Sequence, residues 1–187
     1  MTGRIRSRMA TVSLVALVVV AAASPVAAED RTKLDRSAIE ALHSLTKGNT
    51  AADLLNQKAK AVLVFPSIVK AGFMFGGQLG DGVLLKGGKP VGHYNSIAGS
   101  YGLQAGVQVF GYALFFMNEE ALKYLDKSDG WELGVGPSIV VVDAGLGKSL
   151  TSTTISQDVY AFIFDQKGLM AGIGIQGSKI TRIHPRP

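Results

Sequence analysis

The sequence predicts an α+β domain in which a Gly-rich, strongly curved antiparallel sheet or partial barrel carries two N-terminal helices and one inserted helix. Apolar residues recur at helical spacing before residue 60, and short β-branched and aromatic runs fill the rest of the chain. Of the 23 glycines, 21 lie between Gly72 and Gly177. Glycine weakens a strand unless the backbone bends or approaches another segment closely, so this many glycines indicate a tightly coiled sheet.

The first 28 residues have the layout of a secretory signal peptide. A start with three arginines precedes an apolar run, Val12–Ala23, and the small residues Val26–Ala28 precede an acidic residue. The apolar run is too short to span a bilayer. We therefore expect cleavage after Ala28, which leaves a single domain at residues 29–187 that is exported to the periplasm or secreted.

Most of the net positive charge of the chain lies in this leader. Removing its three arginines takes the 19 Lys and Arg residues to 16, against 14 Asp and Glu, so the net charge falls from +5 to +2. A charge this small does not favour a nucleic-acid partner, which would need lysines and arginines clustered along one face. The chain has no cysteine, so packing alone must hold the fold, even in an oxidising compartment.

Helices are expected in three places. Residues 33–47 carry apolar side chains three or four positions apart, which predicts a helix that Gly48 ends. A second helix is expected to begin at Thr50, whose side chain is the predicted cap. A third begins after Asn118, a favourable cap followed by two glutamates in the first turn.

Strands are expected wherever β-branched and aromatic residues gather between glycines. These runs are 62–65, 72–75, 83–85, 107–110, 139–142, 159–164 and 180–183. The segments 86–90 and 165–168 contain glycines that can adopt a positive φ, so turns are predicted there.

Two glycine-rich stretches resemble nucleotide-binding loops. The run GIGIQG at 172–177 fits G-x-G-x-x-G, but only ten residues follow it, with neither a helix nor the acidic residue that contacts a ribose. It is expected to form a strand over 169–176. The stretch 142–149 lacks the first glycine of a P-loop, because Val142 stands there, and is expected to be an ordinary loop between strands.

No constellation of catalytic or metal-binding residues is apparent. The three histidines lie far apart in sequence, and no serine has the G-x-S-x-G spacing of a hydrolase. We therefore predict no enzymatic activity, no cofactor and no metal.

Two groups of side chains are candidates for contact with lipid. The aromatic and methionine residues are expected to be mainly core, with a lipid-accepting groove as the alternative. They are Phe73, Met74, Phe75, Phe110, Tyr112, Phe115, Phe116 and Met117. Six cations at predicted strand ends and turns could meet lipid phosphates, or else form a solvated rim. They are Lys70, Lys86, Lys89, Lys148, Lys179 and Arg182.

Several segments, in order along the chain, resemble the SYLF domain family. The first, AVLVFPSIVKAGFMFGGQLGDGVLL at 61–85, has the family's apolar strand, Pro-Ser, Lys-Ala-Gly step and Gly-rich strand. The match continues through 100–108, 113–118, 133–136, 159–162 and 167–172. Residues 33 to 183 are covered in this way.

The resemblance implies a domain that binds phospholipid or a membrane surface. Eukaryotic relatives associate with phosphoinositide-bearing membranes and with actin, and bacterial relatives are exported proteins regarded as lipid binders. This chain departs from those relatives in two ways: it begins with an export signal, and residues 29–36 are mixed in charge and do not form a basic amphipathic arm. Actin and a specific phosphoinositide are therefore not expected as partners. The alternative is a structural or protein-interaction module of the cell envelope.

Overall fold

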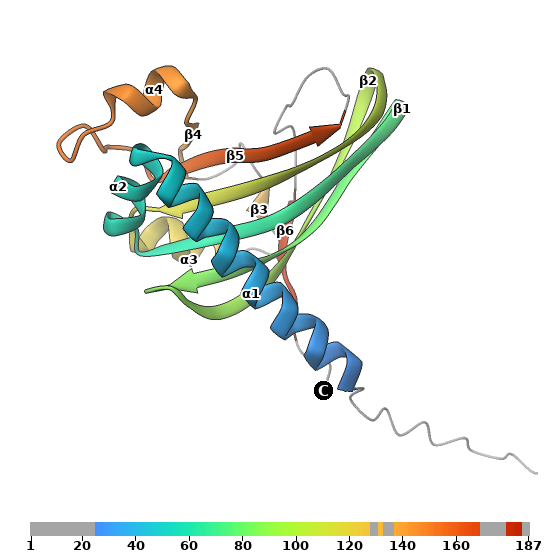
Figure 1. Cartoon of the computed structure of the whole chain (residues 1–187), viewed down its shortest axis with the longest axis horizontal. Helices are drawn as coiled ribbons and strands as arrows, with labels where there is room; N and C mark the ends of the chain where they lie inside the picture. The colour runs from blue at the N-terminus through green and yellow to red at the C-terminus, as the bar shows by residue number, and fades with distance from the viewer. Residues whose placement is uncertain (1–24, 128–130, 133–136, 169–178, 185–187) are drawn as a thin grey trace, which may run out of the picture.

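A computed structural model describes residues 25–127, 131–132, 137–168 and 179–184. Figure 1 shows a strongly curled sheet crossed on one side by a long N-terminal helix. This arrangement confirms the predicted α+β class and the curved sheet. The predicted strand at 169–176, which includes GIGIQG, lies outside the described residues.

One long hairpin dominates the sheet. Strands β1 (Ala61–Lys86) and β2 (Lys89–Phe116) pair antiparallel along their whole lengths, from Ala61 opposite Phe116 to Lys86 opposite Lys89. The predicted turn is confirmed, since Gly87 and Gly88 join the strands with φ values of 56° and 76°. The three separate strands expected before this turn are one continuous strand.

The hairpin is folded back so that the two halves of β1 lie side by side. A Cβ added to Gly80 would lie 2.8 Å from the carbonyl oxygen of Ser67, and one added to Gly82 would overlap the ring of Phe65. Only glycine permits so close an approach of two backbones. The expectation that glycines serve a coiled sheet is therefore confirmed at these two positions.

Further strands extend the C-terminal half of β2. Strand β5 (Val159–Gly168) pairs antiparallel with β2, and the short β4 (Ile139–Val141) pairs with β5 in parallel. The parallel pair departs from the antiparallel sheet expected. The turn predicted at 165–168 is wrong, because these residues continue β5. Asp165, with a φ of 51°, lies in a bulge between Phe164 and Lys167, and Gly168, with a φ of 103°, pairs with Gln108 beyond it. Positive φ serves both turns and bulges, so the local sequence does not separate them.

The N-terminal half of β2 has different neighbours. Strand β6 (Lys179–Arg182) pairs antiparallel with it, placing Arg182 opposite Tyr94 and Lys179 opposite Ile97. The two-residue β3 (Trp131–Glu132) pairs with β6. Since β2 is shared by β1, β5 and β6, it is the central strand of the fold.

Two helices cover what we call the outer face of the sheet. Helix α1 (Pro25–Gly48) and helix α2 (Thr50–Lys58) pack apolar side chains against β1 and β2. The first four residues of helix α1, 25–28, belong to the predicted leader. The predicted cap at Thr50 is wrong by one position, because the Oδ1 atom of Asn49 accepts the N–H groups of Ala51 and Ala52, at 3.0 and 3.1 Å.

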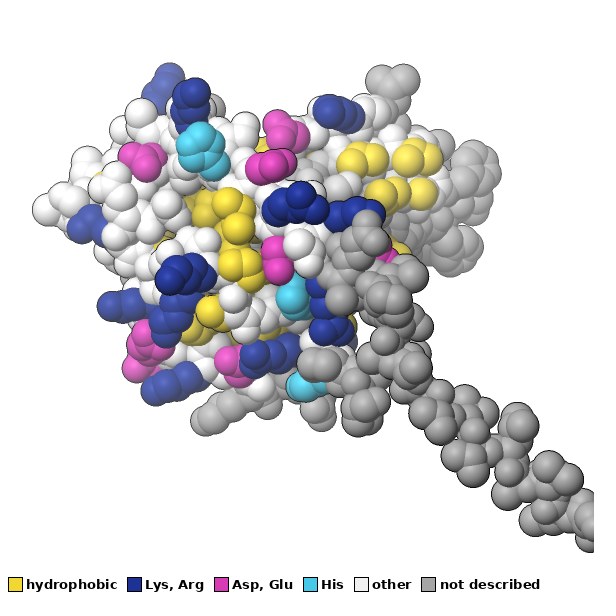
Figure 2. All heavy atoms as spheres, turned by 60° about the horizontal axis from the view of Figure 1, so that its bottom comes forward, with side chains coloured by type: hydrophobic (Ala, Val, Ile, Leu, Met, Phe, Trp, Pro, Cys, Tyr) yellow, Lys and Arg dark blue, Asp and Glu magenta, His cyan; other side chains and the backbone are white. Residues whose placement is uncertain are grey.

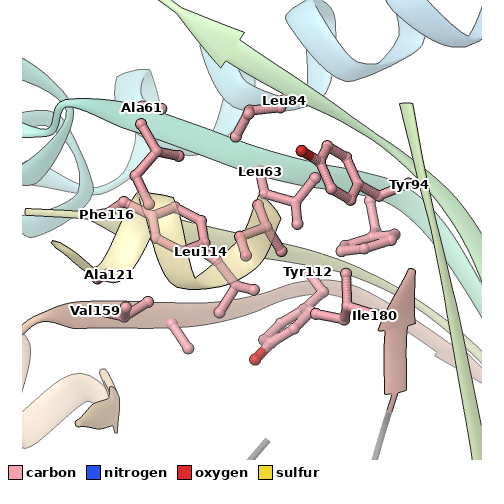
Figure 3. Packing of buried hydrophobic residues seen from close by; sticks show 14 of the residues in the cluster. Ala61, Leu63, Leu84, Tyr94, Tyr112, Leu114, Phe116, Ala121, Val159 and Ile180 are labelled. Carbon is pink, nitrogen blue, oxygen red and sulfur yellow. The ribbon is translucent and has the colours of Figure 1, made fainter. Parts of the chain in front are cut away.

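The opposite, inner face packs against helix α3 (Glu119–Lys127). The predicted cap is confirmed: the Oδ1 atom of Asn118 accepts the N–H of Ala121 at 2.8 Å. Figure 3 shows how the inner cluster combines aliphatic side chains from β1, β2, β5 and β6 with the rings of Tyr94 and Tyr112.

A fourth helix stands where a loop was expected. Helix α4 (Ala144–Ser149) begins after Asp143, whose carboxylate accepts the N–H groups of Gly145 and Leu146 at 2.9 and 2.8 Å. The expectation of a loop at 142–149 was therefore wrong, because a strong N-cap compensates for the two glycines in this helix. Among the described helices, none is long and apolar enough to cross a membrane.

The predicted aromatic core is confirmed where the side chains are described. Phe110, Tyr112, Phe115 and Phe116 are all at most 3% exposed. Met117 is partly buried against the outer cluster. The side chains of residues 73–75 lie outside the described part of the structure.

Candidate functional site

The six cations selected from the sequence do not form one cluster. Lys86 and Lys89 face each other at the hairpin turn, and the Lys86 Nζ atom lies 4.0 Å from a carboxylate oxygen of Glu119. Lys148 stands on α4, beside α2, while Lys179 is exposed on β6. Lys70 is not at a strand end as expected. It lies within β1, is only 5% exposed, and faces Gln108 across the strands.

Arg182 joins β6 to α3 and β2. Its Nη1 atom donates to the carboxylate of Asp126 at 2.9 Å, and its guanidinium lies 5.8 Å from the ring centre of Tyr94. The Tyr94 hydroxyl donates to the same carboxylate at 2.8 Å. Burial raises the pKa of Tyr94, and this hydrogen bond raises it further. Two groups, Asp126 and Tyr94, therefore orient the guanidinium of Arg182.

Arg182 also lines a cleft of about 350 Å³ where three segments meet. The first segment is the beginning of α1, with Arg31 and Asp35, and the second is the beginning of β2, from Pro90 to His93. The end of β6 supplies the third. The Nε2 atom of His93 lies 2.8 Å from a carboxylate oxygen of Asp35, so a hydrogen bond links α1 to β2 beside the cleft. Sequence spacing could not reveal this site, because its residues are far apart in the chain.

A row of exposed aliphatic side chains crosses the outer face beyond the two helices, and we call it the apolar row. Leu79 and Ile97 are cross-strand partners with 56% and 57% exposure, and Val69 and Val107 are 46% and 56% exposed. Val69 pairs with Val109 and Val107 pairs with Ala71, so Val69 and Val107 are diagonal neighbours across β1 and β2. The close approach of Gly80 to Ser67 and Ile68 places Leu79 on the segment beside Val69.

A cation adjoins one end of this row. Lys179 lies directly opposite Ile97 in the sheet register and is itself exposed. In register, paired residues project from the same face of a sheet, so a lysine flanks the aliphatic side chains. Figure 2 shows lysine and arginine side chains interspersed with exposed hydrophobic ones on the face it presents.

The inner face buries polar atoms that have no hydrogen-bond partner in the described part of the chain. These are the Ser96 and Tyr112 hydroxyls and the Gln108 side-chain carbonyl. Burial raises the pKa of Tyr112 well above its ordinary value. The described residues include no group of three or more side chains that could hold a metal ion.

Part of the chain is similar to a known protein family. Residues 97–184 match the family model Ysc84, described as "Las17-binding protein actin regulator". No curated protein matches the chain. The matched segment runs from the middle of β2 to just past β6 and contains Lys148, Lys179 and Arg182 among the candidate cations.

Proposed function

We propose, from the match of residues 97–184 to the Ysc84 (SYLF) family model, that the chain is a non-enzymatic domain that binds phospholipid at a membrane surface. SYLF domains are binding modules that associate with lipids and, in eukaryotes, with actin. The signal-like first 28 residues support a periplasmic or secreted location and a partner other than actin.

The apolar row is the observation that carries this proposal. We infer that these four aliphatic side chains, each about half exposed on neighbouring strand segments, make a contiguous apolar surface. Contiguous apolar surface of this kind is typical of interaction sites. Covering it would contribute about 25 cal/mol for each Å² of apolar area removed from water.

Lys179 favours a membrane over a purely apolar partner. Its position opposite Ile97 places an ammonium group at the edge of the row, where lipid phosphates would lie once the aliphatic side chains entered the interface. A lysine near an anionic membrane surface contributes about 1 kcal/mol. The net charge of +2 expected for residues 29–187 is too small for long-range attraction alone, so apolar contact must supply much of the affinity.

Vesicle flotation tests the proposal. The protein purified from cells that express the full chain is mixed with anionic vesicles of phosphatidylglycerol and phosphatidylcholine, or with neutral vesicles of phosphatidylcholine alone. We expect flotation with anionic vesicles, weaker flotation with neutral ones, and partial loss at high salt because exposed charges are screened.

Two matched variants locate the contact. Ile97→Glu introduces a carboxylate into the apolar row, whereas Val141→Glu makes the same change at an aliphatic residue of β4 that is 46% exposed. We expect Ile97→Glu to abolish flotation and Val141→Glu to preserve it, with both variants melting near the wild type. Failure of the wild type to float with either vesicle at low salt would reject membrane binding. Equal flotation of the two variants would reject the apolar row as the contact.

A further inference from the structure

We propose that the cleft between α1, β2 and β6 binds the phosphate group of an anionic ligand, with Arg31 and Arg182 as its donors. The assignment of that phosphate to a phospholipid headgroup rests on the proposed function. The phosphate site itself rests on the geometry of the cleft alone.

The orientation of Arg182 is the first step. Its Nη1 atom donates to Asp126 and its Cζ atom lies 5.8 Å from the ring centre of Tyr94, so two contacts orient the guanidinium before any ligand arrives. Its Nε and Nη2 atoms lie beside Gly92 in the cleft wall, 3.7 and 3.4 Å from where a Cβ of that residue would stand. Two nitrogens on one edge of a guanidinium match two oxygens of a phosphate, and a fixed orientation lowers the entropic cost of binding.

The absence of a side chain at Gly92 keeps this edge open. A Cβ there would lie 3.2 Å from the Tyr94 ring and 3.4 Å from the Nη2 atom of Arg182. These contacts are tight, and the added methyl would occupy the space in front of the guanidinium edge. Replacing Gly92 by alanine therefore fills this part of the cleft by adding a single methyl group.

The charges in the walls favour an anion. Arg31 and Arg182 enter from α1 and β6, and Asp35 is the only acidic side chain lining the cleft among the described residues. That carboxylate lies 2.8 Å from the Nε2 atom of His93, and Asp126, which does not line the cleft, accepts from the Nη1 atom of Arg182 only, so Arg31 and the Nε–Nη2 edge of Arg182 remain directed at the space. Arg31 remains in the chain after the expected cleavage at Ala28.

The remaining wall is apolar and suits an amphiphile. Pro90, Val91 and Ile183 line the cleft beside the two arginines. Val91 is 47% exposed, so the apolar lining continues to the surface. A phosphate linked to a glycerol or acyl group would place its charged oxygens at the arginines and its carbon atoms on this wall.

Four single variants of the full chain test the site in two matched pairs. Arg31→Gln removes a donor from the cleft, and Arg36→Gln removes the same charge from an exposed position of α1 that does not line it. Gly92→Ala fills the cleft, and Gly99→Ala adds the same methyl on the same strand, where no atom lies within 4 Å of the added Cβ. Each variant is titrated calorimetrically with sn-glycerol 3-phosphate, with inorganic phosphate, and with vesicles that contain phosphatidic acid.

We expect saturable binding of glycerol 3-phosphate to the wild type. Arg31→Gln should weaken it by about tenfold, the effect of losing one charge-assisted hydrogen bond. Gly92→Ala should weaken it by a similar factor because the added methyl fills the cleft, and the two controls should stay within about twofold of the wild type. Equal effects within each pair, or no saturable binding of any of the three probes to the wild type, would overturn the site. A parallel loss with phosphatidic acid vesicles identifies the lipid headgroup as the source of the phosphate. Binding of the soluble phosphates without vesicle binding supports the cleft and rejects the membrane function.

Discussion

The hydroxyl groups of Tyr112 and Tyr94 lie in the same apolar cluster but differ in their hydrogen bonding. Tyr112 is 3% exposed, and its hydroxyl has no hydrogen-bond partner in the described part of the chain. The hydroxyl of Tyr94 donates to the carboxylate of Asp126 at 2.8 Å. Replacing each tyrosine by phenylalanine removes one oxygen atom and leaves the ring in place. The two substitutions should therefore change stability in opposite directions.

The size of each stability change follows from whether the hydroxyl has a hydrogen-bond partner. A buried polar group without a partner costs about 1–3 kcal/mol, so Tyr112→Phe should raise the free energy of unfolding by an amount within that range. Tyr94→Phe removes a hydrogen bond to a charged group and should lower it by about 1.5–3 kcal/mol. For a chain of this size, each kcal/mol corresponds to roughly 2–4 °C in melting temperature.

Equilibrium unfolding in urea, followed by circular dichroism, measures both effects. The pH dependence supplies a second readout, because burial raises the pKa of Tyr112 and the folded state resists its ionisation. This contribution to stability is fully present below pH about 10, the ordinary tyrosine value, and is lost as the pH rises above it. Tyr112→Phe should reduce that alkaline loss. A clear destabilisation by Tyr112→Phe at neutral pH would refute the reasoning and would show that the hydroxyl makes a stabilising contact.

Three further predictions concern other parts of the chain. Hydrogen bonds to the Asp158 carboxylate, the main one from the Ser138 backbone N–H, lower its pKa in the folded state. The stability that they contribute is present above the ordinary aspartate pKa and is lost as the pH falls through the lowered pKa. Asp158→Asn should remove this acid dependence, measured by urea titrations between pH 7 and pH 2. Gly80→Ala should destabilise the fold by about 1–3 kcal/mol through its clash with backbone, whereas Gly99→Ala should be nearly neutral; equal melting temperatures would contradict the close approach. Mass spectrometry of the exported protein should find a chain that begins directly after Ala28, and an intact leader would contradict the cleavage.

Local sequence signals predicted the helices well. The spacing that ends at Leu45 and the cap at Asn118 each depend on residues close in the chain, and both are borne out by the structure. The cap of α2 was misplaced because Asn49 and Thr50 are both competent caps, and only the backbone path decides between them.

Long-range arrangement was harder to predict. The burial of Lys70 depends on the fold of the hairpin, which no local pattern encodes. The apolar row was missed because aliphatic residues that alternate along a strand, such as Ile97, have the sequence pattern of core residues. Ile97 is exposed because α1 and α2 end before they cover it, which the sequence pattern does not reveal. The cleft was missed for a related reason, since Arg31 and Arg182 meet only through tertiary structure.

The continuity of β2 sets the distance between the two proposed contacts. Gly92 in the cleft and Ile97 in the apolar row lie on the same uninterrupted strand, so no hinge separates them. At about 3.3 Å per residue they are roughly 17 Å apart. Because side chains alternate between the faces of a strand, an odd separation of five residues places Gly92 and Ile97 on opposite faces of β2. One rigid strand would thus hold a bound phosphate and a membrane surface at a fixed separation on its two sides, so the two contacts could be made by different molecules.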